Sequence, residues 1–591
     1  MNSRSFYFYH VSQNPQLPPE VAHAQWIFLG EDYSEFLRWK KIMPPSSKAL
    51  EFKGDLDEAI AALSKPFSDI ITELGKAHDS PAWWSSRISE KNNLVSPLFL
   101  HCCYLSVFNK MAEKYQAPLV VIAEDYDLLK CCEAIALSKA KVAVRALTLA
   151  RYQEYARRLI YALGRMVKFK ARCWQLRWQK SSDIPEDRKK DVVLIHTHID
   201  ESCLGQDGQF KDRYFGHLSS WLNDKGYNAI TLPVLFNMRR TPEAIWEFLR
   251  QASGFFINPF EYYSLLDYVF VFKESLRQQL IDFRNIKLIG LDVTRLFKAE
   301  QRRKAFACLD PLLYHRLPRA LTAHGFQIAR VIMPFENMVE EKMFNLGLKI
   351  YSSGTISVGY QHSTLWPTLM CQFVSSQEAA FAPLSDKIVC NGAIFLRILA
   401  EKGLPKEKLV LGPALRYAYL SNKKSQEPQA PIADALVTLP LMKSDAAELL
   451  MKVIEAFRQQ TQLKILIKPH PMIEKIWLSD MTAKLMIPGH FSIVEGSMDE
   501  RVKQVKMVIG MSSGTLMEVY AAGKPLIVVG RNTSIDFNPL GFLPGFDRIY
   551  VSPQEIEQRA LAILNQDQWT TETKDIFSPV SDELMGAFLS N

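Results

Sequence analysis

The sequence predicts a parallel α/β fold, because short apolar runs are followed repeatedly by a polar turn and then by a helical pattern. The clearest case spans residues 463–529. It opens with the run Leu463–Ile467 and closes with Leu526–Val529, and a helical pattern over Leu516–Ala522 lies between them. Runs of this length, bounded by turn residues, are typical of buried strands in parallel sheets. Such sheets bind ligands at the carboxyl ends of their strands, where the polar turns fall.

Two polar turns in this region have the composition of a phosphate site. A helix N-terminus offers unpaired N–H groups and the positive end of the helix dipole, and hydroxyl groups add further donors. A histidine at the end of the preceding strand is able to donate to the same anion. The alternative is that the serines only cap a helix and the histidine is an ordinary turn residue. The first turn contains Lys468, His470 and Pro471, and the second contains Ser512, Ser513, Gly514 and Thr515.

A second unit of the same kind lies in the first half of the chain. The strand Val192–Ile195 is followed by the acids Asp200 and Glu201, and a further strand is expected at Asn228–Leu232. Catalytic carboxylates are often placed at the carboxyl end of such a strand. Asp200 and Glu201 are therefore candidates for a general base, and the alternative is that they are solvated loop acids.

Two later strands, Phe326–Ile332 and Ile356–Tyr360, also end in turns with candidate residues. Glu336 follows the first strand, and Gln361 and His362 follow the second. We interpret Glu336 as a base candidate and the other two as cleft residues. The alternatives are that Glu336 is a helix-start acid and that His362 is a packed turn residue. Asp292 is a weaker third candidate for the base.

Composition narrows the class of protein. The chain of 591 residues is too long for one core and predicts two or three domains. A hydrophobic content of 48% with 23% charged residues is ordinary for a globular enzyme. No apolar run is long enough to cross a membrane, and the N-terminus has no signal-peptide core, so we expect a cytoplasmic protein. The nine cysteines show no metal-ligand spacing, which favours reduced, buried thiols and predicts no metal site.

A basic segment over residues 151–180 breaks this ordinary composition. It contains nine lysines and arginines, a single acid (Glu154) and an interleaved set of apolar and aromatic residues. Such a pattern predicts one or two amphipathic helices that lie on an anionic membrane surface, here the inner membrane. The alternative is a solvated basic helix packed on the protein. No nucleic-acid-binding motif accompanies the charge, so no nucleic-acid partner is expected.

The Lys-x-His-Pro turn at 468–471 followed by the Ser-Ser turn at 512–513 resembles the nucleotide-binding half of GT-B glycosyltransferases that use CMP-activated sugars. These are bacterial sialyltransferases, polysialyltransferases and the Kdo transferases of capsule and lipopolysaccharide assembly, in which the two motifs hold the donor's phosphate and cytidine. A related pattern occurs in glycerophosphotransferases of teichoic acid synthesis, which use CDP-linked donors. The turn at 359–363 is similar to a Gln-His-Gly turn of capsular Kdo transferases, with Ser363 in place of the glycine.

The resemblance implies two Rossmann-like domains that face each other across a cleft, behind an N-terminal α/β extension. It also implies transfer of an acidic sugar, Kdo or a sialic-acid-like nonulosonate, from a CMP donor to a surface glycan acceptor. No cofactor or metal is expected beyond the nucleotide-sugar substrate. Two alternatives remain open: another nucleotide-sugar enzyme of this fold (a UDP-sugar 2-epimerase or a CDP-glycerol-type phosphotransferase), and a non-catalytic scaffold of a glycan-assembly complex.

The expected domain order follows from these units. The four parts are an N-terminal α/β region at 1–150, a basic helical segment and linker at 151–187, a Rossmann-like acceptor domain at 188–380, and a Rossmann-like nucleotide-sugar-binding domain at 381–591.

Overall fold

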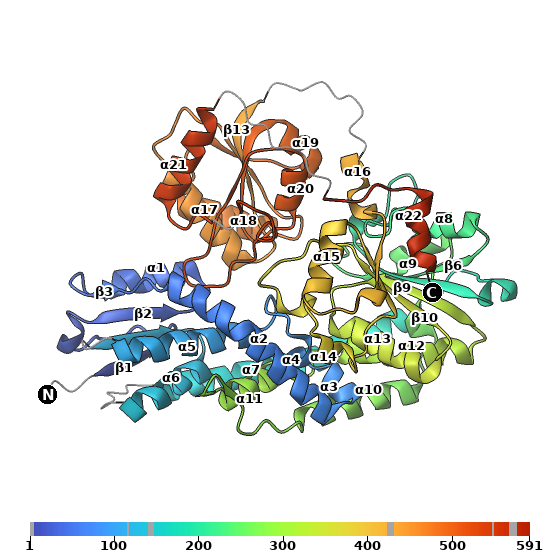
Figure 1. Ribbon diagram of the computed structural model, residues 1–591, viewed down its shortest axis with the longest axis horizontal. Coiled ribbons are helices and arrows are strands. Elements are labelled where there is room, and N and C mark those ends of the chain that lie inside the picture. Colours follow the sequence, from blue (N-terminus) through green and yellow to red (C-terminus); the bar gives the residue numbers. More distant parts are fainter. Residues whose placement is uncertain are drawn as a thin grey trace.

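A computed structural model describes residues 5–114, 118–139, 147–421, 431–546, 549–566 and 576–590. Within them, three parallel sheets form the centres of three α/β units, which Figure 1 shows as separate lobes. Helices cover the sheets, as parallel sheets require because both of their faces must be buried.

The N-terminal unit contains a four-stranded sheet in the order β1–β4–β2–β3. Alternate side chains of these strands enter two different cores, one shared with α2 and α5 and the other with Trp39 of α1. The strands are β1 (Phe6–His10), β2 (Gln25–Leu29), β3 (Lys48–Ala49) and β4 (Leu119–Ala123). The main helices are α1 (Tyr33–Ile42), α2 (Lys53–His78), α5 (Leu98–Lys114) and α6 (Tyr126–Lys139).

The central unit contains a six-stranded parallel sheet in the order β12–β11–β10–β9–β5–β6. Its strands are β5 (Val192–Ile199), β6 (Asn228–Leu235), β9 (Ile328–Pro334), β10 (Ile356–Gln361), β11 (Lys387–Cys390) and β12 (Leu409–Leu411). Helices include α8 (Leu218–Asp224), α10 (Leu265–Gln279), α12 (Leu309–Ala323) and α13 (Val339–Tyr351). Helix α11 (Thr294–Arg303), between α10 and α12 in the chain, packs instead against α5 and α6 of the N-terminal unit.

The central sheet corrects two expectations. β5 is longer than the strand expected at 192–195, because His196 to Ile199 keep pairing with β6. The boundary expected after residue 380 falls inside this sheet, because β11 pairs with β10 and β12 pairs with β11. The chain end returns to the same unit: Phe588 is buried against the ring of Tyr360, with the centroids 5.2 Å apart.

The C-terminal unit contains a five-stranded parallel sheet in the order β15–β14–β13–β16–β17. Its strands are β13 (Ala433–Thr438), β14 (Ile465–Lys468), β15 (Phe491–Ile493), β16 (Val505–Gly510) and β17 (Leu526–Val528). Its helices include α17 (Lys443–Phe457), α18 (Lys475–Leu485), α20 (Thr515–Ala521) and α21 (Pro553–Leu564). The predicted fold class is confirmed: two Rossmann-like sheets face each other, and a third α/β unit precedes them.

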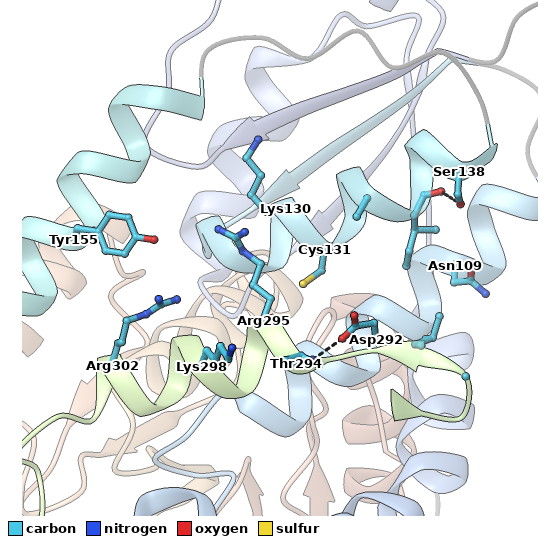
Figure 2. A pocket seen from close by; sticks show the side chains of 14 residues that line it. Asn109, Lys130, Cys131, Ser138, Tyr155, Asp292, Thr294, Arg295, Lys298 and Arg302 are labelled. Atoms are coloured by element: carbon cyan, nitrogen blue, oxygen red, sulfur yellow. Dashed lines mark hydrogen bonds between the residues drawn. The ribbon is translucent and has the colours of Figure 1, made fainter. Parts of the chain in front are cut away.

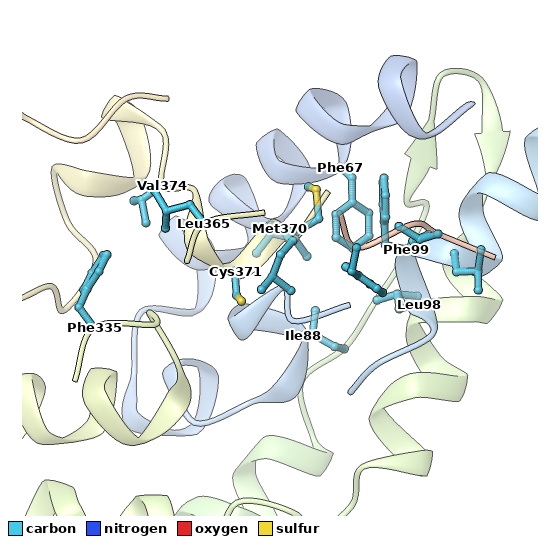
Figure 3. Packing of buried hydrophobic residues seen from close by; sticks show 14 of the residues in the cluster. Phe67, Ile88, Leu98, Phe99, Phe335, Leu365, Met370, Cys371 and Val374 are labelled. Carbon is cyan, nitrogen blue, oxygen red and sulfur yellow. The ribbon is translucent and has the colours of Figure 1, made fainter. Parts of the chain in front are cut away.

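The N-terminal unit packs against both of the other units. Figure 3 shows Phe67, Leu98 and Phe99 of this unit in one apolar cluster with Met370 and Cys371 of the central unit. Trp83 and Trp84, which follow α2, are buried in the same cluster, so they are packing residues.

Polar contacts complete these junctions. Lys91 forms a buried ion pair with Glu378 of the central unit. On the C-terminal side, Arg531 pairs with Asp445 at 2.5 Å and Glu448 at 2.9 Å and donates to the backbone carbonyl of Glu31. The N-terminal unit is therefore a strap that joins the two Rossmann-like units away from their facing turns.

The basic segment forms one helix, α7 (Leu147–Arg177), which contacts α6 of the N-terminal unit and α12 of the central unit. Among the described residues, no helix is both long and apolar enough to span a bilayer.

Candidate functional site

The turns after β5, β9 and β10 surround a small cavity of about 50 Å³. Its walls include His198, Tyr214, Glu336 and His362. The Oε1 atom of Glu336 lies 3.6 Å from Nε2 of His362, and the side chain of Glu336 is 29% exposed. The structure thus brings together two of the predicted residues, Glu336 and His362, at the carboxyl edge of the central sheet.

Burial sets the protonation of these two groups. Loss of hydration raises the pKa of Glu336, while the positive charge of Arg416 and a hydrogen bond with Ser363 pull it down in part. Burial lowers the pKa of His362 well below its usual value, and Arg416 adds to that effect. The arrangement therefore places a neutral imidazole beside a carboxyl group of raised proton affinity, as a general base requires.

Asp200 and Glu201 have a different environment. Asp200 forms an ion pair with Arg213 at 2.7 Å, and Glu201 forms one with Arg240 at 2.8 Å. Glu201 also accepts hydrogen bonds from the backbone N–H groups of Arg239 and Arg240. Both carboxylates are thus engaged in holding arginine side chains and loops.

The loop after β5 carries Arg213 and Tyr214 to the site. Oδ1 of Asp212 accepts the backbone N–H groups of Tyr214 at 2.8 Å and of Phe215 at 2.9 Å, and the hydroxyl of Thr197 at 3.1 Å. Burial raises the pKa of Asp212 to about 6. These hydrogen bonds fix the loop in a single conformation.

On the C-terminal unit, His470 follows β14 and lies half-buried. Its Nδ1 accepts the backbone N–H of Met472 at 3.1 Å, so the neutral ring carries its proton on Nε2. Burial lowers the pKa of His470 to about 4, and the positive charges of Lys468, Arg213 and Arg416 add to this. His470 is therefore a neutral hydrogen-bond donor close to arginines of the opposite unit.

The turn before α20 is strained and has a free hydroxyl. Ser512 adopts a left-handed backbone with φ of 46°, which is uncommon for a residue with a side chain. Its Oγ is buried and has no hydrogen-bond partner among the described residues. Ser513 Oγ accepts the N–H of Thr515 at 3.4 Å, whereas the side chain of Ser512 serves as no cap. Within the described residues, Ser512 thus has a buried hydroxyl whose hydrogen-bonding capacity is unused.

The two facing turns meet directly. A Cβ atom added to Gly514 would lie 3.3 Å from Oγ1 of Thr364, which follows His362 in the turn after β10. This contact places the Ser512–Thr515 turn of one unit against the Gln361–Thr364 turn of the other.

The remaining predicted residues have other positions. Gln361 is fully buried, accepts the N–H of Asn391 at 3.2 Å and donates to the carbonyl of Ser363, so it fixes the turn. Pro471 is exposed, and Lys468 is half-buried at the end of β14. Among the described residues, no group of three metal-ligating side chains is placed to hold an ion.

Three residues near the site were absent from the sequence prediction. Arg213 and Arg416 lie near enough to His470 to lower its pKa, and the guanidinium of Arg416 lies 5.6 Å from the Tyr214 ring centroid. Glu518 of α20 accepts a hydrogen bond from Tyr419 in the connector between the units. Only Arg416 had a usable signal, since it follows a strand and a Gly-Pro turn at 412–413.

A much larger cavity, of about 770 Å³, lies elsewhere between α6, α7 and α11. Figure 2 shows Lys130, Arg295 and Arg302 on its walls, together with Asp292. Asp292 accepts the backbone N–H of Thr294 at 2.9 Å at the start of α11. Asp292 is therefore an acid at the start of a helix, and it lies in a different cavity from Glu336. This position does not fit the weaker base candidate that we considered.

The chain matches no protein-family model and no curated protein. Solved structures show distant similarity. The S. aureus MnaA–UDP co-structure has 11% identity and a TM-score of 0.40, with 66% of this chain and 94% of that chain covered. UDP-GlcNAc 2-epimerase from Neisseria meningitidis bound to UDP-GlcNAc has 9% identity, coverage of 67% and 97%, and a TM-score of 0.37. MurG from Acinetobacter baumannii has 11% identity, coverage of 64% and 91%, and a TM-score of 0.32.

Proposed function

We propose that the protein is a glycosyltransferase that moves an acidic sugar, Kdo or a sialic-acid-like nonulosonate, from a CMP donor to a surface glycan. One observation carries this proposal: a neutral histidine donor and a serine turn with a free hydroxyl face a carboxyl–imidazole pair across the cleft. The histidine and the serine turn can donate hydrogen bonds to a phosphate. The carboxyl–imidazole pair can accept the proton of an attacking hydroxyl.

On the donor side, CMP leaves as a phosphate monoester, whose developing negative charge must be stabilised. His470 Nε2–H, the Ser512 hydroxyl and the N-terminus of α20 are the donors available for this purpose. One fixed donor aimed at developing charge is worth about 10²–10³ in rate. Arg416 adds positive charge near the same place.

On the acceptor side, Glu336 takes the proton of the attacking hydroxyl. The acceptor oxygen then forms a bond to the anomeric carbon while the bond from that carbon to the CMP oxygen breaks. His362 lies beside Glu336, with its Nε2 atom 3.6 Å from the carboxyl oxygen. Asp200 and Glu201 position Arg213 and Arg240 and thereby shape the acceptor side.

Nucleotide release distinguishes this reaction from its alternatives. Purified protein is incubated separately with CMP-Kdo, CMP-sialic acid, CDP-glycerol and UDP-N-acetylglucosamine, and the products are separated by chromatography. We expect CMP from one of the two CMP-sugars and no reaction of the other donors. Conversion of the UDP-sugar to its 2-epimer would show an epimerase, and CMP from CDP-glycerol would show a phosphotransferase. If the wild-type protein reacts with none of the four donors and does not bind CMP, the protein is a non-catalytic scaffold.

A further inference from the structure

Helix α7 has two apolar faces on opposite sides. One face packs on the protein through Ala162, Phe169, Cys173 and Leu176, which are all buried. The opposite face points to solvent, although it also carries large apolar side chains. A helix that only packs on its own domain needs one apolar face. The second face therefore requires a separate explanation.

The outer face is a continuous stripe along the helix. Its members recur at intervals of three or four residues, or twice that, so they lie on one side of the helix. Each is between 54% and 68% exposed. At 1.5 Å per residue the stripe is about 39 Å long. Exposed apolar side chains are usually scattered, and contiguous ones mark an interaction surface. The members are Tyr152, Ile160, Leu163, Val167 and Trp174 of the helix and Trp178, the first residue after it.

Positive charge borders this stripe. Arg157, Lys168, Lys170 and Arg177 are exposed, and within the described part of the chain none of them forms an ion pair. The one acid of the segment, Glu154, pairs with Arg158, which is buried and turned toward Asp127. In the part of the chain that the structure describes, the outer face of α7 thus combines apolar and cationic groups, and the one acid of the segment is paired elsewhere.

We propose that α7 lies in the plane of an anionic phospholipid bilayer and binds it through this outer face. The charge of this face identifies its ligand. The exposed cations match the phosphate headgroups of the bilayer, and the apolar stripe beside them matches the acyl chains. Trp174 and Trp178 have the amphipathic rings that settle at this interface, with centroids 5.9 Å apart. The helix rests on the surface and leaves its inner face packed against the protein.

The test uses the full chain and vesicles of 30% phosphatidylglycerol in phosphatidylethanolamine, read by co-sedimentation. The variant Val167→Glu/Trp174→Glu changes two exposed residues of the stripe. The matched control, Ile476→Glu/Met486→Glu, changes residues that are 77% and 75% exposed on the C-terminal unit. We expect the stripe variant to bind at least tenfold more weakly and the control to bind as wild type.

A charge variant, Lys168→Gln/Lys170→Gln, gives a second readout that does not alter the stripe. Each cation near an anionic surface contributes roughly fivefold in affinity, so we expect a loss of at least tenfold. Wild-type binding should also fall in 1 M salt, where the screening length is about 3 Å. Acyl chains brominated near the headgroups should quench tryptophan fluorescence in wild type and not in Trp174→Phe/Trp178→Phe.

Several results would overturn the proposal. These are no wild-type binding to the anionic vesicles, equal binding by the stripe variant, and loss of binding by the control alone. Self-association of the wild type without lipid, abolished in the stripe variant, would assign the face to a second copy of the chain. Thermal melts identify any variant that fails to fold. If the stripe variant does not fold, the lipid binding of the charge variant tests the proposal.

Discussion

At the scale of single residues, the site separates one carboxyl group from the others by its environment. Glu336 is only partly exposed and forms no ion pair with an arginine among the described residues, whereas Asp200 and Glu201 are each ion-paired. The three acids therefore cannot be equivalent in the reaction, although all of them follow strands of the same sheet.

Replacing these acids separately should reveal their roles. We expect Glu336→Gln to lower kcat by about 10²–10⁴ with donor affinity preserved, since removal of a general base has that effect. Asp200→Asn should mainly raise the acceptor KM, because it frees Arg213. Steady-state kinetics on both substrates measure this. A steep fall in kcat for Asp200→Asn alone would assign the base to Asp200.

The pH profile should report Glu336 directly. Because burial raises its pKa, Glu336 is protonated over a wider pH range than an ordinary glutamate, and it acts as a base only after losing that proton. Activity should therefore fall as the pH drops through the raised pKa. Burial lowers the pKa of His470 to about 4, so the His470 ring stays neutral while Glu336 titrates at its raised pKa. In a plot of log kcat/KM against pH, His470→Ala should keep the acidic limb of the wild type. If Glu336→Gln also keeps that limb, Glu336 is not the general base.

The donor turn makes a separate prediction. His470→Ala and Ser512→Ala should each weaken donor binding or turnover roughly tenfold or more, because a hydrogen bond to a charged group contributes about 1.5–3 kcal/mol. His490→Ala is a matched control, since its ring bonds a backbone carbonyl in the same unit at 3.0 Å. Calorimetric titration with CMP measures binding. Normal affinity in both test variants, with normal melts, would show that neither residue contacts the donor.

At the scale of elements, the junction between the N-terminal and central units depends on a buried charge pair. Lys91 contacts Glu378 and also donates to the carbonyl of Phe373 at 3.2 Å. The neighbouring segment is held by Lys342, which donates to the carbonyl of Ser89 at 2.7 Å.

Breaking this pair should destabilise the protein more than removing it. Lys91→Met leaves Glu378 buried and unpaired, which typically costs about 3–5 kcal/mol. The double variant Lys91→Met/Glu378→Leu replaces both charges with apolar groups and should recover much of that loss. Midpoints of thermal unfolding measure the difference. Equal melting of wild type and Lys91→Met would show that the pair contributes little.

At the scale of the whole molecule, the N-terminal unit connects both Rossmann-like units. Its contact with the C-terminal unit includes Tyr104, which donates to the carbonyl of Thr533 at 2.6 Å, and the ion pair of Lys53 with Asp536, also at 2.6 Å. Motion of the two facing units relative to each other must therefore bend or break this strap.

Arg531 is the residue whose loss should release the strap. Arg531→Met leaves Asp445 and Glu448 without their shared partner, although Glu448 keeps Lys452 at 2.8 Å. We expect faster hydrogen exchange over 531–536 and over the loop after β2, with exchange in β9 and β10 unchanged. Exchange followed by mass spectrometry checks this. A uniform rise across all three units would indicate global destabilisation instead.

Local patterns in the sequence were sufficient to predict the strand–turn–helix units and the polar turns that end their strands. These are local properties: apolar runs such as Ile465–Ile467 form buried strands, and the residues that follow must lie at the carboxyl edge of a parallel sheet. For this reason Glu336, His362, His470 and Ser512 were predicted correctly to end or follow strands, and the fold class followed from them.

Tertiary structure alone decided which of these turns meet and which side chains join them. Arg213 comes from an irregular loop and Arg416 from the connector after β12, and neither position has a periodic signal. The assignment of β11 and β12 to the central sheet depended on the hydrogen bonds of β11 with β10 and of β12 with β11, which composition does not encode. The two faces of α7 were likewise separated only by packing, because residues of both faces are apolar and only their contacts differ.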